Sequence, residues 1–123
     1  MGLTLLGCLA PLSCGSPNSE TSAEQSLDRL TAAAMDGRAS GSDRALAQAR
    51  LRAMGPEGLV AMRAAGEGLA RDTPAYDRWR DAMTGVSRQL HADVSDLYWY
   101  TDLDKATQAA QEQDKPILSL RLL

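Results

Sequence analysis

The sequence predicts a mainly helical fold, with an N-terminal helical bundle followed by a strand–helix–strand segment of the α/β type. Three observations support this prediction. Among the 123 residues, 20 are Ala and 18 are Leu, whereas Phe is absent and there are only three Val and one Ile. Such a composition favours helices over sheets. Helix-stop and helix-start residues recur between positions 22 and 92, and two apolar runs flank a helical pattern in residues 97–123.

The first predicted helix follows residues 15–21, whose Ser, Pro and Asn are typical of a flexible linker. Thr21 and Ser22 begin two overlapping capping boxes, so the helix is expected to start there. Gly37 is expected to end it. The predicted inward-facing residues are Leu27, Leu30 and Ala34.

A second and a third helix are predicted on either side of Met54-Gly55-Pro56. Gly suits a left-handed helix end, and Pro suits the first position of the next helix. Ser42 is expected to cap the second helix, and the third is expected to run from Pro56 to about Ala70. The predicted inward-facing residues are Leu46, Ala49 and Ala53, then Leu59, Met62, Gly66 and Leu69.

A fourth helix is predicted after Thr73, with Pro74 in its first turn. Its amphipathic stripe is Trp79, Met83, Val86 and Leu90. Residues 22–92 therefore predict a small helical bundle. Residues 52–59 also resemble one hairpin of a HEAT-type repeat, but no second copy follows, and such arrays need about three units to bury a continuous core.

Composition and charge exclude several functions. Thirteen basic and 16 acidic residues give a net charge of −3, which argues against a nucleic-acid partner. Two Cys and a single His cannot build a four-ligand zinc site, and no pattern requires a metal or another cofactor. The Arg side chains of residues 38–88 alternate with acids, which is typical of solvated helix faces. The segment with the acids at 93, 96, 102 and 104 is not a calcium loop, because it lacks the central Gly and the closing Glu of such a loop.

Residues 1–14 predict export. No charge precedes Glu20, and the stretch resembles the apolar core of a secretory signal, although it is too short to span a bilayer. Leu5-Leu6-Gly7-Cys8 resembles a bacterial lipobox, and Cys14 is a second candidate for lipidation because a polar tether follows it. A lipid anchor would hold the protein on a membrane in the periplasm or at the cell surface. The alternatives are an ordinary cleaved signal, a disordered tail and a Cys8–Cys14 disulfide.

The last 27 residues, 97–123, predict a strand, a helix and a strand. Leu97–Tyr100 has the aromatic composition of a strand, and Thr101-Asp102 can cap a helix whose inner face is Leu103, Ala106 and Ala110. The apolar run after Lys115-Pro116 suits a buried strand. This order begins a β-α-β unit.

The residues of this segment resemble the opening of thioredoxin-like domains. In that family a Trp precedes a helix of the form Asp-Leu-x-x-Ala, and a Lys-Pro leads into the central strand. Trp99, Lys115 and Pro116 match these framework positions. The resemblance implies that residues 93–123 begin an incomplete thioredoxin-like α/β domain. The redox Cys of the family follow this strand, so the resemblance places no catalytic residue in this chain.

Two functions follow. The first is an inactive fragment of an exported, membrane-tethered thioredoxin-like protein, whose full length would have a thiol–disulfide redox role or a silent thioredoxin fold. The second is a helical, HEAT-like binding or scaffold module on a lipid anchor, with its last strand only a β-appendage; a weaker variant is a short intact protein whose last strand pairs with another chain. The sequence leaves open whether the full-length protein is an enzyme, and it identifies no protein partner.

Overall fold

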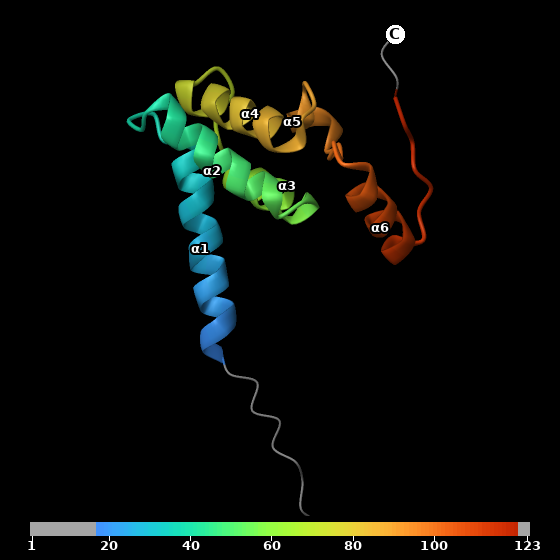
Figure 1. Ribbon diagram of the computed structural model, residues 1–123. Helices are drawn as coiled ribbons and strands as arrows, with labels where there is room; N and C mark the ends of the chain where they lie inside the picture. The colour runs from blue at the N-terminus through green and yellow to red at the C-terminus, as the bar shows by residue number, and fades with distance from the viewer. Residues whose placement is uncertain (1–16, 121–123) are drawn as a thin grey trace, which may run out of the picture.

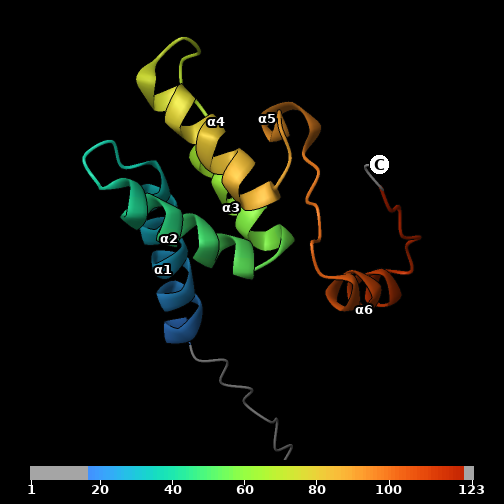
Figure 2. The same cartoon turned by 45° about the horizontal axis from the view of Figure 1, so that its top comes forward.

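The computed structural model describes residues 17–120. In Figures 1 and 2 the first four helices cross one another in a bundle, and the sixth lies apart from it at the end of an extended connection. The helices are α1 (Pro17–Met35), α2 (Gly41–Ala53), α3 (Pro56–Ala65), α4 (Pro74–Ser87), α5 (Ala92–Ser95) and α6 (Leu103–Gln113). The predicted N-terminal helical bundle is thus confirmed.

The predicted β-α-β unit is wrong for the described part of the chain, because residues 17–120 contain no strand. The segments 97–100 and 117–120 lie outside regular secondary structure. They flank α6 at opposite ends and do not pair (Figure 1). A strand requires a neighbouring backbone to complete its hydrogen bonds. The backbone N–H of Trp99 donates instead to the carbonyl of Ser87 at the end of α4.

Local capping explains where three of the helices begin. The Thr73 hydroxyl accepts a hydrogen bond from the Tyr76 N–H at the start of α4, as the sequence predicts. Asp102 caps α6 in the same way by accepting from the next turn, again as predicted. Helix α2 differs, because its N-cap is Ser40 rather than Ser42. The Ser40 hydroxyl accepts from the Asp43 N–H at 3.1 Å.

Two helix boundaries also differ from prediction. Helix α1 begins at Pro17, before the expected capping boxes, and Pro is well suited to a first helical turn. Helix α3 ends at Ala65 instead of continuing to about residue 70. Gly68 follows with a φ of +81°, a left-handed conformation that interrupts a helix.

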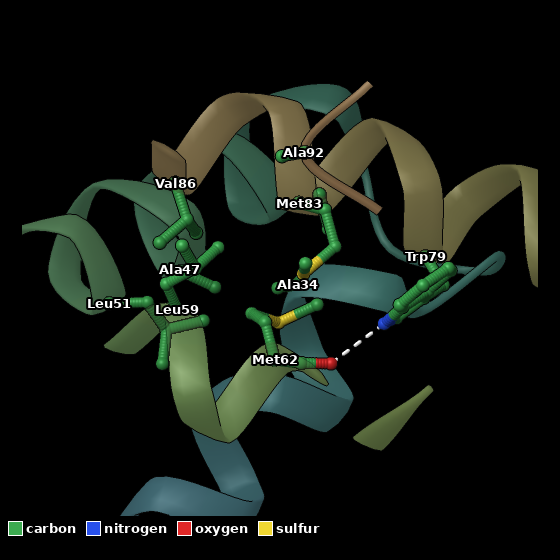
Figure 3. Close-up of a cluster of buried hydrophobic side chains, with 10 residues drawn as sticks. Ala34, Ala47, Leu51, Leu59, Met62, Trp79, Met83, Val86 and Ala92 are labelled. Carbon is green, nitrogen blue, oxygen red and sulfur yellow. Dashed lines mark hydrogen bonds between the residues drawn. The ribbon is translucent and has the colours of Figure 1, made fainter. Parts of the chain in front are cut away.

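The core lies where α1, α2, α3 and α4 meet (Figure 3). Burying a Leu, Met or Val side chain completely contributes about 1.5–3 kcal/mol. The fully buried large apolar residues are Leu51, Met62, Met83 and Val86. The rest of the buried apolar cluster is Ala34, Ala47, Leu59, Trp79, Ala82 and Ala92. Leu27 and Leu30 of α1 pack against it, partly buried, as predicted.

Helix α2 buries a different face from the predicted one. Ala47 and Leu51 are in the core, whereas Leu46 is 54% exposed and Ala49 and Ala53 are exposed. Positions 46 and 51 are five residues apart, so at about 100° per residue they point to different sides of a helix. Only one of the two Leu can therefore face the bundle.

The predicted stripe of α4 holds except at its last position. Trp79, Met83 and Val86 are buried, whereas Leu90 is 75% exposed. The helix ends at Ser87, and Arg88 adopts a left-handed conformation with a φ of 60°. Leu90 therefore lies beyond the helix and does not continue its buried face.

Candidate functional site

The part of the chain that follows the helical bundle exposes several large apolar side chains. We call residues 97–120 the arm and residues 17–96 the body. Leu103 is 70%, Leu118 76% and Leu120 68% exposed, and Ile117 is exposed as well. Helix α6 has no buried residue, and no other described helix packs extensively against it. The arm is therefore the candidate interaction surface of the described chain.

Arg52, in the last turn of α2, joins the arm to the body. One of its terminal nitrogens donates to the carbonyl oxygen of Val86 at 2.7 Å. The other donates to the carbonyl oxygen of Trp99 at 2.8 Å and to the hydroxyl of Thr101 at 3.2 Å. Its guanidinium lies 5.0 Å from the centre of the Tyr98 ring. The Tyr98 hydroxyl in turn donates to the Arg52 carbonyl at 2.9 Å.

The position of Arg52 has a physical reason. The last four carbonyls of a helix have no partner within that helix, and Val86 lies in the last turn of α4. A cation at this end also interacts favourably with the helix dipole. Because a guanidinium presents several donors in a fixed fork, one Arg52 side chain serves both this helix end and the arm.

Trp99 provides a second attachment at the same helix end. Its backbone N–H donates to the carbonyl oxygen of Ser87 at 3.0 Å. Its indole N–H donates to the side-chain oxygen of Gln89. The Ser87 side chain is fully buried and accepts from the Gln89 N–H at 3.1 Å, so the acceptors lie in an ordered turn. Within the described chain, Trp99 therefore helps to hold the arm against the end of α4.

A shallow cavity of about 190 Å³ lies between α2 and the arm, beside Arg52 and Lys105. Tyr98 and Tyr100 line it, with ring centres 5.0 Å apart in an edge-to-face arrangement. Burial raises the pKa of Tyr100 above its ordinary value, and the electrostatic interactions with Tyr98 and Glu112 raise it further. Tyr100 is therefore uncharged near neutral pH, and its ring can remain packed in the junction.

Comparisons with protein-family models, with curated proteins and with solved structures find no match to this chain. The resemblance of residues 97–123 to thioredoxin-like domains thus stays a prediction made from the residues alone.

The predicted framework residues are not brought together. Lys115 and Pro116 follow α6, and Trp99 precedes it, so a helix of 11 residues, about 16 Å long, separates them. The Lys115 backbone N–H donates to the Ala110 carbonyl at 2.9 Å and closes the helix end. Pro116 is exposed at the start of the apolar tail. The lipidation candidates Cys8 and Cys14 lie outside the described residues.

The acidic residues near α5 pair with other residues of the body. No group of three or more His, Cys, Asp or Glu within residues 17–120 could hold a metal ion. Asp96 pairs with Arg63, and Asp93 accepts from the Tyr76 hydroxyl at 3.3 Å. The second oxygen of Asp93 and the hydroxyl of Ser95 are buried without a protein partner. Within the same range, no helix has the length and apolar character needed to cross a membrane.

No sequence pattern singles out Arg52 and Tyr98 as a pair. Arg52 lies among the interleaved Arg and acidic residues of positions 38–88, a pattern that predicts solvated helix faces. Tyr98 was assigned to a strand. The only signal for this pair is that three aromatic residues and a Thr follow the bundle at 98–101, where a cation can contact a ring and a hydroxyl at once.

Proposed function

We propose that this chain is a helical binding or scaffold module, held on a membrane by a lipid anchor, that offers its arm to a protein partner. The observation that carries the proposal is the exposure of Leu103, Leu118 and Leu120 on a segment that Arg52 fixes to the body. Contiguous exposed apolar surface is typical of sites that bind other proteins. A segment held in place before binding also loses less conformational entropy when it binds.

Charge limits the kind of partner. Residues 102–115 contain four acidic and two basic side chains, a net charge of −2, and all six are exposed. The same part of the chain carries the exposed apolar side chains Leu103, Ile117, Leu118 and Leu120. We therefore expect a protein surface with an apolar centre and basic residues at its edge, because complementary charge favours the correct encounter.

The anchor belongs to the proposal on sequence grounds. Cys8 follows a lipobox-like motif and Cys14 precedes a polar tether, so either could carry the lipid. Such an anchor places the module in the periplasm or at the cell surface. A redox role is the weaker proposal for this chain, since the thiols at positions 8 and 14 are its only ones and both lie in the leader.

The binding proposal can be tested by site-specific photo-crosslinking in the native cell. A photo-reactive amino acid is placed at Leu103, at Leu118 or, as the control, at Val60. Val60 is a matched position because it is apolar and 67% exposed but lies on α3 in the body. We expect one discrete protein adduct from both arm positions and none from Val60. Adducts that are absent, or equal at all three positions, would reject the arm as a binding surface.

The anchor is tested separately by metabolic labelling with an alkyne fatty acid. We expect label on the wild-type chain and on only one of the variants Cys8→Ala and Cys14→Ala. Two outcomes would contradict a lipid on one of these two cysteines: label on both variants, or no label on the wild-type chain.

A further inference from the structure

The arm is attached to the body over a very short stretch. The hydrogen bonds between the two come from residues 98, 99 and 101 of the arm, and Arg52 takes part in three of these contacts. Beyond this stretch, α6 has no buried residue and the tail is exposed. The direction in which α6 leaves the body therefore depends on a few polar contacts and on the packing of the Tyr98 side chain against the core.

We propose that Arg52 is a latch, a positioning residue that holds the arm in a docked orientation and whose loss releases the arm as a unit. In the docked state, one guanidinium neutralises the end of α4 and binds the Trp99 carbonyl on the arm. In the released state, the fork no longer reaches the arm, and the arm pivots about residues 96–98. The latch is a property of this chain alone and does not rest on the proposed partner.

Arg52 carries more of the attachment than the other contacts do. Its hydrogen bonds are charge-assisted, and such bonds are stronger than those between neutral groups. It also bonds both sides of the junction at once, so its removal breaks the link and leaves the Val86 and Trp99 carbonyls unpaired. The remaining contacts of Trp99 are to one backbone carbonyl and one Gln side chain, both neutral.

The test uses nuclear magnetic resonance on the full chain, which contains only two Trp residues. Trp79 is buried in the body and reports whether the bundle remains folded, whereas Trp99 reports on the junction. The variant is Arg52→Ala. Its matched control is Arg50→Ala, which removes an exposed Arg from the same last turn of α2.

In Arg52→Ala we expect the Trp99 indole resonance to shift and the exchange rate of the Trp99 amide to rise by about tenfold or more. The Trp79 resonance should stay in place. Residual dipolar couplings of α6 amides should shrink relative to those of the body, whereas amide exchange within α6 should not change, because the helix moves intact. Arg50→Ala should match the wild type in every measurement. Unchanged Trp99 exchange and unchanged α6 couplings in Arg52→Ala would overturn the proposal.

Two further variants keep the test decisive if Arg52→Ala also shifts Trp79. The double variant Tyr98→Phe, Thr101→Val removes the Tyr98 hydrogen bond to the Arg52 carbonyl and the Thr101 contact, but keeps the guanidinium bond to the Trp99 carbonyl. We expect it to speed Trp99 exchange much less than Arg52→Ala does, and an increase as large as that of Arg52→Ala would overturn the latch. Arg52→Lys keeps the charge but lacks the fork, so it should give an exchange rate between those of wild type and the released state. A rate in Arg52→Lys equal to that of the wild type would show that the fork is not required and would also overturn the proposal.

Discussion

The indole N–H of Trp79 in α4 donates a hydrogen bond of 2.7 Å to the carbonyl oxygen of Met62 in α3 (Figure 3). Met62 is fully buried, and Trp79 is only 7% exposed. The carbonyl lies in the last turn of α3, where helix carbonyls lack an internal partner. One side chain thus both fills the core and satisfies a buried polar group of a neighbouring helix.

Replacing Trp79 with Phe should therefore destabilise the body. The variant leaves the Met62 carbonyl buried and unpaired, which costs about 1–3 kcal/mol, and the smaller ring adds a packing defect. Urea unfolding followed by circular dichroism measures the change. Trp99→Phe is the control and should leave the midpoint of the bundle nearly unchanged. Equal midpoints for wild type and Trp79→Phe would contradict this assignment of the hydrogen bond.

Gly58 should tolerate no side chain. It begins the close approach of α3 to α2, and a Cβ at this position would overlap the backbone carbonyl of Leu51. Because backbone cannot rotate away as a side chain can, Gly58→Ala should destabilise the protein by roughly 1–3 kcal/mol. Gly41→Ala is the matched control, since nothing lies within 4 Å of a Cβ placed there. Thermal unfolding should separate the two variants, and similar melting temperatures would argue against the packing of α2 on α3.

The position of the α2 cap can be tested with two serines. Ser40→Ala removes the acceptor of the Asp43 N–H and should cost about 0.5–2 kcal/mol. Ser42→Ala removes only a hydroxyl contact to Ser40, so a change of a few tenths of a kcal/mol is expected. Chemical denaturation of both variants gives the comparison. A larger loss in Ser42→Ala would move the cap to the position that the sequence favoured.

The pKa of Tyr100 predicts how the junction responds to alkali. Burial, followed by the electrostatic interactions with Tyr98 and Glu112, raises this pKa, so the unfolded chain loses the phenolic proton first as pH rises. The stabilisation contributed by neutral Tyr100 is therefore complete below about pH 10 and is lost as pH rises through the folded pKa. Ultraviolet titration should show a tyrosinate transition above about pH 10 that is missing in Tyr100→Phe. Superimposable titrations, after allowance for one fewer Tyr, would refute the shift.

Features encoded by neighbouring residues were predicted well. Pro56, Thr73-Pro74 and Asp102 mark the starts of α3, α4 and α6 in both sequence and structure. Each acts within one helical turn, through a fixed φ or a side chain that accepts a backbone hydrogen bond. Ser40 and Ser42 show the limit of this approach, since both are good caps and the choice depends on how the preceding turn approaches α2.

Features that depend on distant residues were predicted less well. Leu46 and Leu51 are equally apolar, and which of them faces the core is decided by α1, α3 and α4. Leu97–Tyr100 has the composition of a strand, but composition cannot supply the neighbouring backbone that a strand needs. For the same reason Arg52 could not be distinguished from the solvent-exposed Arg residues, because its acceptors lie 34 or more positions away in the chain.

The end of α4 is completed by residues from outside that helix. Val86 relies on Arg52 and Ser87 relies on the backbone of Trp99 for the partners of their carbonyl oxygens. Drawing the arm away therefore uncaps α4, and the final turn of that helix should fray with it. The position of the arm and the length of α4 are therefore coupled in one cooperative equilibrium. A protein that pulls on the arm would also change the packing around Val86, which is fully buried in the hydrophobic core.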